Sequence, residues 1–281
     1  MRLGTRGSAL ALVQARAVAA ALDGDHEIVE ITTSGDRGIA GDKARWIDTI
    51  EDALERGEID LAVHSAKDVP AAPLLREGMA LAAVLGREDA RDALVGAPGL
   101  DALAPGARVG TSSLRRRAQL LAVRPDLEVV AVRGNVDTRL RKLADGACDA
   151  LVLAAAGLRR LGRAEAIGAL LDPTVFVPAP GQGLLAVEGR TVPAALVDAD
   201  GEMALHAERH VVEALEATCD TPVGVHHDGV ALHAFVGLPD GSAWIRDSVV
   251  ADDPAPLIVE RLRSMGAADL LARAAEMAPS A

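Results

Sequence analysis

The chain has 281 residues, half of them hydrophobic and a quarter charged, and a formal net charge of -12 at pH 7. This length exceeds one ordinary hydrophobic core, so two or three domains are expected. The acidic balance and the scarcity of aromatic residues (no Tyr, two Phe and two Trp) exclude a general nucleic-acid binder, which needs a basic surface and rings on which bases stack.

The sequence also bears on the compartment. The first residues contain no apolar run like that of a signal peptide, and the longest apolar stretch, 147–158, contains Asp149 and is too short to cross a membrane. The two cysteines, Cys148 and Cys219, lie in different settings and indicate reduced thiols rather than a disulfide framework. We therefore expect a cytoplasmic protein.

The first two-thirds of the chain alternates predicted strands and helices. In chain order we expect a helix at 9–22 capped by Ser8, a strand at 27–32, a helix at 44–56, strands at 59–64 and 108–109, a helix reaching Leu121, a strand at 128–132, a helix at 136–144, a strand at 150–153 and a short helix reaching Leu161. This alternation is typical of parallel sheets with helices on both faces. In that architecture ligands bind beyond the carboxyl ends of the strands.

The pattern changes in the last third of the chain. Residues 178–183, rich in Pro and Gly, indicate a rigid hinge or crossover. One long helix at 202–217, short strands near 229–236 and 243–250 and a final helix at about 256–277 follow. This order predicts a small α+β module appended to two α/β domains.

The stretch from Thr111 to Arg117 breaks a rule of helix electrostatics. Ser112 or Ser113 caps a helix whose first turn carries three arginines, although a helix start is already partly positive. Residues 111–142 hold eight basic residues against three acidic ones. Because such violations concentrate at functional sites, we interpret this stretch as a pocket for a ligand with several negative charges. The alternative is a solvated basic face, and Arg117 is expected to be exposed.

Arginines recur at or just after the ends of predicted strands. Arg115 of this stretch is one of them, and the others are Arg6, Arg133 and Arg139. Arg133 is followed by Gly134 and Asn135 in a turn whose backbone N–H groups can bind an anion. Since planar guanidinium groups bind carboxylates through two hydrogen bonds, the sequence favours a ligand with several carboxylates.

Asp68 follows a predicted strand and lies next to Lys67. Taken alone, the two residues are a surface ion pair in the turn before Pro70. In an arginine-rich cleft, the Asp68 carboxylate would stay ionised and could hydrogen-bond an N–H group or exchange a proton with a leaving amine.

The cysteines and histidines give weaker signals. Cys148 lies beside a predicted strand and is interpreted as a packed thiol. Cys219 follows the C-terminal end of a helix, where the dipole does not lower a thiol pKa, so a turnover nucleophile is disfavoured and a covalently held group is compatible. His206 and His210 have a spacing that could hold a metal but lack a third ligand, so a solvated helix face is favoured and no metal is predicted.

Seven ordered motifs identify a family. They are GTRGSALAL at 4–12, AVHSAKDVP at 62–70, GTSSLRR at 110–116, RGNVDTRL at 133–140, AGLRRLG at 156–162, PGQG at 180–183 and the loop around Cys219. With these motifs the chain closely resembles the hydroxymethylbilane synthase, or porphobilinogen deaminase, family over nearly its whole length.

The resemblance implies an α/β fold of three domains: two domains like those of periplasmic binding proteins and a small C-terminal α+β domain. The expected bounds are 1–84 with 184–200 for the first domain, 88–178 for the second and 202–281 for the third. In this family the third domain carries a cysteine, matched by Cys219, that holds a dipyrromethane cofactor through a thioether.

The resemblance also implies the activity. Such enzymes condense four porphobilinogen molecules head to tail on the cofactor, release ammonia and hydrolyse off the linear tetrapyrrole hydroxymethylbilane for porphyrin and heme biosynthesis. Asp68 matches the catalytic aspartate. The residues expected to bind carboxylates of the cofactor or substrate are Arg6, Ser8, Lys67, Thr111, Ser112, Ser113, Arg115, Arg116, Arg133, Gly134, Asn135, Arg139 and Arg160.

Two further segments have expected roles. Gln182 matches the hinge, and Lys43 and Trp46 stand where the family has a lid, although residues 41–46 depart from the usual lid sequence. The enzyme is expected to act as a monomer without nucleic acid or membrane, with hand-over of its product to uroporphyrinogen-III synthase.

Three other function classes are possible for this sequence. A non-catalytic paralogue that binds pyrroles or anions is the main alternative, weakened by the joint presence of Asp68 and Cys219. A solute-binding module lacks an export signal. A cysteine hydrolase lacks a credible pairing of Cys and His.

Overall fold

The first part of the chain builds a five-stranded sheet. The computed structural model describes residues 1–33, 47–71, 76–217 and 221–277. The strands of this first sheet are β1 (Arg2–Arg6), β2 (Glu27–Ile31), β3 (Leu61–Ser65), β4 (Ala80–Val84) and β10 (Leu185–Gly189), in the order β2-β1-β3-β10-β4. Helix α1 (Ala9–Ala20) covers one face with Ala15 and Val18, and α2 (Asp48–Glu55) contributes Ile50 and Leu54 to the other.

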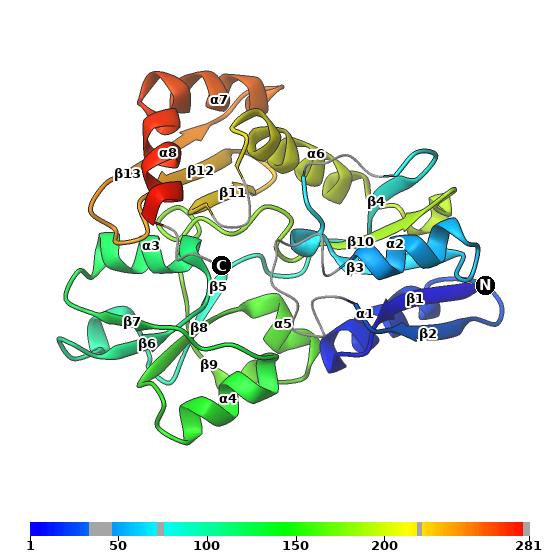
Figure 1. Ribbon diagram of the computed structural model, residues 1–281, viewed down its shortest axis with the longest axis horizontal. Helices are drawn as coiled ribbons and strands as arrows, with labels where there is room; N and C mark the ends of the chain where they lie inside the picture. Colours follow the sequence, from blue (N-terminus) through cyan, green and yellow to red (C-terminus); the bar gives the residue numbers. More distant parts are fainter. Residues whose placement is uncertain (34–46, 72–75, 218–220, 278–281) are drawn as a thin grey trace.

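A second five-stranded sheet lies at the other end of the long axis (Figure 1). Its strands are β5 (Asp92–Val95), β6 (Arg108–Gly110), β7 (Glu128–Val130), β8 (Ala150–Ala154) and β9 (Ile167–Leu170), in the order β7-β6-β8-β5-β9. Its helices are α3 (Leu114–Val123), α4 (Val136–Ala144) and α5 (Ala155–Arg160). The expected α/β fold is confirmed.

The expectation of wholly parallel sheets is wrong in one respect. Strand β10 runs antiparallel to β3 and β4, and β5 runs antiparallel to β8 and β9. Both strands belong to the segments in which the chain passes between the two sheets. The sequence pattern missed them because each is only four or five residues long and carries a charged residue, Asp92 or Glu188.

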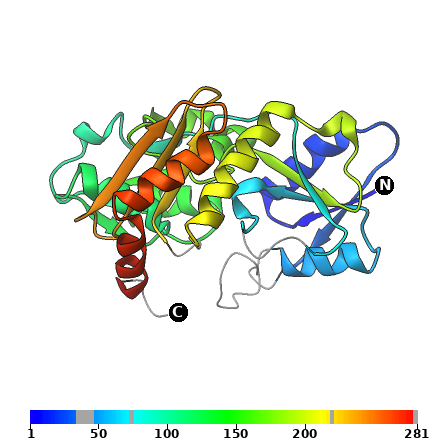
Figure 2. The ribbon, with the colours of Figure 1, turned by 90° about the horizontal axis from the view of Figure 1, so that it is seen from above.

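A third, antiparallel sheet follows. It consists of β11 (Val223–His227), β12 (Leu232–Gly237) and β13 (Trp244–Val249), with α6 (Ala199–Ala214), α7 (Pro254–Ser264) and α8 (Ala267–Met277) packed around a core of their own. Figure 2 shows α6 passing from this sheet towards the first one, and α6 contacts both β4 and β11.

Several predicted boundaries in the last third were wrong. The long helix begins at Ala199 because the Asp198 side chain caps it by accepting a hydrogen bond from the Gly201 N–H, and strand β11 was missed. The single final helix is two helices, since α7 ends at Ser264 and the chain restarts at Ala267. Within the described residues, no helix is long and apolar enough to cross a membrane.

Arg117 connects the second and third sheets, so the expectation that it is exposed was wrong. Its Nε donates to the Pro239 carbonyl oxygen at 3.1 Å, and its Nη1 donates to the Val129 carbonyl oxygen at 3.0 Å. The guanidinium is half-buried because the loop after β12 covers the outer side of α3.

Replacing Arg117 by alanine should therefore lower the free energy of unfolding by about 2 kcal/mol, since charged donors to buried carbonyls contribute at this level. Urea unfolding checks this prediction. Arg56→Ala is the matched control, because the Arg56 guanidinium makes an exposed ion pair with Glu58 and such pairs contribute little to stability. Equal urea midpoints for the two variants would contradict the assignment of Arg117 as an interdomain contact.

Candidate active site

The carboxyl ends of central strands from the first two sheets face each other. Helix α1, which follows β1, lies beside α5, which follows β8 (Figure 1). Between them is a small cavity of about 20 Å³, whose lining includes Ser65 and Lys67 from the end of β3 and Arg160 from α5. The Arg160 Nη2 donates to the Gly183 carbonyl oxygen at 2.6 Å, so the 178–183 crossover closes the same region.

Lys67 and Asp68 lie on a short 3-10 helix, Ala66–Asp68, directly after β3. The Ala66 N–H donates to the Leu184 carbonyl oxygen at 3.1 Å. Gly181, with φ +74°, packs against the same turn, and a Cβ at this position would lie 2.9 Å from the backbone nitrogen of Lys67. The sheet and the crossover therefore fix the backbone that carries both candidate residues, whose side chains are half-buried.

The protonation of Lys67 is sensitive to its surroundings. Burial lowers its pKa to about 8; Asp68 and Asp92 oppose the shift, and Arg116 and Arg115 add to it. A lysine with this pKa carries its charge below about pH 8 and can attract a carboxylate there. As the pH rises through 8, that attraction is lost.

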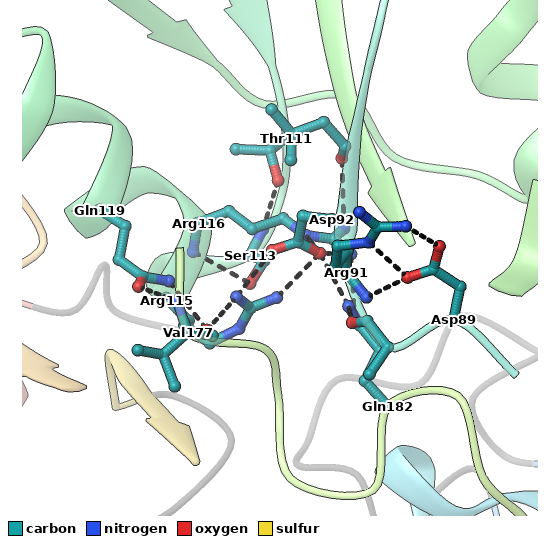
Figure 3. Close-up of polar contacts among 12 residues, drawn as sticks. Asp89, Arg91, Asp92, Thr111, Ser113, Arg115, Arg116, Gln119, Val177 and Gln182 are labelled. Carbon is teal, nitrogen blue, oxygen red and sulfur yellow. Dashed lines mark hydrogen bonds and ion pairs between the residues drawn. The ribbon is translucent and has the colours of Figure 1, made fainter. Parts of the chain in front are cut away.

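Arg115 and Arg116 converge on one carboxylate, that of Asp92 at the start of β5 (Figure 3). The Arg115 Nη1 lies 2.8 Å from Asp92 Oδ2, and the Arg116 Nη2 lies 2.8 Å from Oδ1. All three side chains are buried. Burial alone would raise the pKa of Asp92, but the two guanidinium groups hold it well below its usual range.

The arginine-rich helix start is thus organised differently from the sequence interpretation. The described hydrogen bonds of the Arg115 and Arg116 guanidinium groups go to Asp92, to the carbonyl oxygens of Val177 and Val152, and to Gln182 Oε1. Sequence reasoning missed Asp92 because it is a single acid in a charged loop before a short strand. One signal could have indicated a distant acidic partner: the first turn of α3 contains arginines and no acid that could pair with them.

Gln182, predicted as a hinge residue, lies within this cluster and is buried. Its Nε2 donates to the Ala90 carbonyl oxygen at 2.7 Å and to Asp92 Oδ1 at 2.9 Å (Figure 3). The Arg87 Nε donates to its backbone oxygen at 2.9 Å. One glutamine side chain therefore joins the two segments that cross between the sheets.

Three of the predicted ligand residues serve as helix caps. Ser8 accepts from the Ala11 N–H, Ser113 from the Arg116 N–H and Asn135 from the Thr138 N–H, so they begin α1, α3 and α4. The Thr111 hydroxyl accepts from the Ser113 N–H at 3.2 Å, and Ser112 is exposed. Of the two caps that the sequence proposed for α3, Ser113 is confirmed.

The remaining cationic residues lie around the same region. Arg133 is exposed, and the next residue, Gly134, has φ +119°, as the predicted turn requires. Arg139 is half-buried, and its Nε donates to the Gly134 carbonyl oxygen at 2.7 Å. Burial and the nearby Arg116 lower the pKa of Arg139, whereas Asp68 raises it. Burial likewise lowers the pKa of Arg160.

Some predicted residues lie outside the described part of the chain, namely Lys43, Trp46 and Cys219. Cys148 is buried, and burial raises the pKa of its thiol, in agreement with a packed side chain. His206 and His210 are exposed on α6, whereas Glu208 is buried against Arg87. Among the described residues, no three His, Cys, Asp or Glu side chains group as metal ligands.

The chain matches a known protein-family model. The family model described as porphobilinogen deaminase, dipyromethane cofactor binding domain, matches residues 1–198. The matched residues include Asp68, the arginines of the cluster and Gln182.

Several curated proteins are similar along most of the chain. A porphobilinogen deaminase from Roseiflexus sp. (strain RS-1) is 48% identical over 263 residues, which cover 85% of this chain and 86% of that protein. One from Roseiflexus castenholzii is 44% identical and covers 97% and 98%, and one from Rubrobacter xylanophilus is 46% identical and covers 96% and 95%.

Solved structures give weaker similarity. A nutrient-binding protein from Burkholderia cenocepacia bound to methionine is 13% identical, with a TM-score of 0.42, over 68% of this chain and 84% of that chain. The methionine-binding protein MetQ is 17% identical, with a TM-score of 0.41, over 68% and 82%.

Proposed function

Because the chain belongs to the porphobilinogen deaminase family, we propose that Asp68, Cys219 and the cationic side chains around Asp68 carry out the family reaction in it. That reaction is a transferase reaction of tetrapyrrole biosynthesis. It condenses four porphobilinogen molecules head to tail on a dipyrromethane primer, releases ammonia and ends with hydrolysis to hydroxymethylbilane. The curated relatives support this activity over a non-catalytic binding paralogue.

One observation carries the assignment of the site. The cavity next to Asp68 is lined by Lys67 directly after β3, by Ala154 at the end of β8 and by Arg160 of α5. Lys67 follows a strand of the first sheet, and Arg160 ends a helix that follows a strand of the second, so both parts of the chain contribute positive charge to one region. Porphobilinogen carries an acetate and a propionate group, and a growing chain of pyrroles accumulates carboxylates that such a region would bind.

We assign the carboxylate-binding role by position. Arg6, Lys67, Arg133, Arg139 and Arg160 are assigned to supply positive charge around Asp68, while Ser8, Ser113 and Asn135 cap the helices that follow the strand ends. Arg115 and Arg116 form the inner wall, held by Asp92. Thr111, Ser112 and Gly134 shape the adjoining turns.

Asp68 is the proposed catalytic residue. Its carboxylate assists loss of the substrate amine and stabilises the positive charge that develops on the pyrrole nitrogen. The short helix after β3 and the packed crossover keep this carboxylate in place, so little reorganisation is needed when charge develops.

The cofactor is proposed to be attached at Cys219 through a thioether. When bound, the dipyrromethane supplies the nucleophilic pyrrole carbon on which the chain grows. The cationic side chains around Asp68 fit the dipyrromethane, because its several carboxylates are negatively charged and can accept their hydrogen bonds. Cys219 lies beyond the 198 residues that the family model matches, so its role depends on the loop motif in the sequence.

The domain organisation and the oligomeric state follow the same family pattern in this proposal. Three separate sheets support three domains with the bounds 1–84 plus 184–200, 88–178 and 202–281. We propose a cytoplasmic monomer that hands its product to uroporphyrinogen-III synthase, with Lys43 and Trp46 in a lid.

A pair of variants on one helix tests the carboxylate-binding site. Arg139→Gln should raise the KM for porphobilinogen about tenfold, because one charge-assisted hydrogen bond to a carboxylate is lost. Arg141→Gln, on the same helix but exposed, is the matched control and should leave KM within about twofold. Steady-state kinetics decide the matter, and equal KM values for the two variants would remove Arg139 from the site.

A further inference from the structure

The carboxylate of Asp92 has an unusual number of partners. Its Oδ1 accepts from Arg115 Nη2 at 3.3 Å, Arg116 Nε at 3.0 Å, Arg116 Nη2 at 2.8 Å and Gln182 Nε2 at 2.9 Å. Its Oδ2 accepts from Arg115 Nη1 at 2.8 Å. Five N–H contacts on one carboxylate define the directions of three side chains at once (Figure 3).

Asp92, unlike the two arginines, belongs to a strand of the second sheet, and the sheet fixes its backbone. It begins β5, which pairs with β8 on one side and β9 on the other, and its own backbone oxygen accepts from the Leu171 N–H at 2.8 Å. The side chain is completely buried. Arg115 and Arg116, in contrast, have long side chains with several rotatable bonds and stand in the first turn of α3. Their orientation therefore depends on Asp92, their one charged partner in the described part of the chain, together with the Val177 and Val152 carbonyl oxygens, which accept one hydrogen bond each from them.

We propose that Asp92 is a positioning residue for pyrrole-chain binding: its carboxylate fixes the guanidinium groups of Arg115 and Arg116 in the wall of the active site. This inference rests on the proposed role of the two arginines. Asp92 itself touches no reacting atom. Without it, two adjacent cations would repel each other and turn away from the positions that face the substrate.

The balance of charge supports the same role. Two guanidinium groups and one carboxylate leave the cluster with one net positive charge, so it attracts anions without leaving two buried cations uncompensated. The cluster also reaches Lys67, whose pKa Asp92 raises and Arg116 and Arg115 lower. Asp68 is the other charged group that raises it.

Asp92 also connects the arginines to the crossover segments. Gln182 donates to Asp92, the Arg87 Nε donates to the Gln182 backbone oxygen, and Arg87 forms an ion pair with buried Glu208 of α6 at 2.6 Å. Glu208 Oε2 accepts from the Gly181 N–H at 2.6 Å. A continuous set of contacts thus runs from the third sheet to the arginine pair.

Asp92→Asn tests the proposal, because asparagine keeps the size of the side chain but removes its charge. The purified holoenzyme should show an approximately tenfold higher KM for porphobilinogen with a smaller change in kcat, or a reduced covalent cofactor content by intact mass. Activity should also be lost at lower pH than in the wild type, because removing a nearby negative charge lowers the pKa of Lys67.

The matched control is Asp89→Asn. Asp89 is an acid of the same segment that pairs with Arg91 and Arg159 and makes no described contact with Arg115 or Arg116. This variant should keep KM within about twofold and the pH profile unchanged. A merely structural role of acids in this segment would affect both variants alike.

A second comparison covers the case in which Asp92→Asn does not fold. Arg115→Gln and the double variant Asp92→Asn with Arg115→Gln each avoid leaving two buried guanidinium groups without a counter-charge. If Asp92 positions Arg116, the double variant should have a several-fold higher KM than Arg115→Gln alone, a comparison that does not require the Asp92→Asn single variant.

The outcomes separate the two proposals. If Arg115→Gln leaves KM and cofactor content unchanged, the carboxylate-binding role of Arg115 itself fails. If Arg115→Gln raises KM, but Asp92→Asn changes neither KM nor the pH profile, alone or combined with Arg115→Gln, Asp92 has no positioning role and the inference is overturned.

Discussion

Replacement of Asp68 by alanine should reduce ammonia release from porphobilinogen by about a thousandfold, while the protein stays folded and keeps its cofactor. Two effects combine in this loss. A carboxylate placed for proton transfer contributes about 10²–10⁴ in rate, and one that stabilises developing charge contributes a comparable factor. Single-turnover and steady-state assays of ammonia release measure the effect, and intact mass reports the cofactor.

Asp60 provides the matched control for Asp68. It stands just before β3, at the opposite end of the strand from Asp68, and pairs with Arg2 in an exposed position. Asp60→Ala should retain nearly full activity. Near-normal turnover in Asp68→Ala would remove this residue from the mechanism.

Replacement of Cys219 by alanine should abolish turnover altogether, because the primer has no point of attachment. The variant should also have the mass of its bare sequence. Cys148→Ala is the control, since the Cys148 thiol is buried under the second sheet and burial raises its pKa, which makes it a poor nucleophile. A covalent increment that persists in Cys219→Ala and disappears in Cys148→Ala would reverse the assignment.

The regular part of the fold could be predicted because its signals are local. The first-turn cap and apolar spacing of α4 gave its bounds, Val136–Ala144, without error. Strands β5 and β10 have no such signal, since their place is decided by neighbours far away in the sequence: β10 joins the first sheet only after the second is complete. Short central strands therefore need tertiary information.

The site could be predicted only as a set of residue types. The three arginines at the start of α3 correctly indicated an unusual charge arrangement, but they lie in two different environments. Arg115 and Arg116 turn inward to Asp92, and Arg117 reaches across to the third sheet. Sequence reasoning assumed that a charged side chain without a local partner faces solvent or ligand. Here the partner of the first two lies more than twenty residues away.

Helix capping explains another difference. Ser8, Ser113 and Asn135 were predicted as ligand-binding residues, and their side-chain oxygens are engaged with backbone N–H groups. A residue at the first position of a helix near a strand end satisfies both descriptions, so the sequence pattern could not separate them.

We propose that this chain builds a pyrrole chain on a cofactor tethered at Cys219. The most direct test of this proposal is the intact mass of the purified, unreduced and unmutated protein from cells that make tetrapyrroles. We expect a mass above that of the sequence by one dipyrromethane, with further increments of one pyrrole unit each after brief exposure to porphobilinogen. A protein that has the bare mass of its sequence before and after that exposure would contradict it.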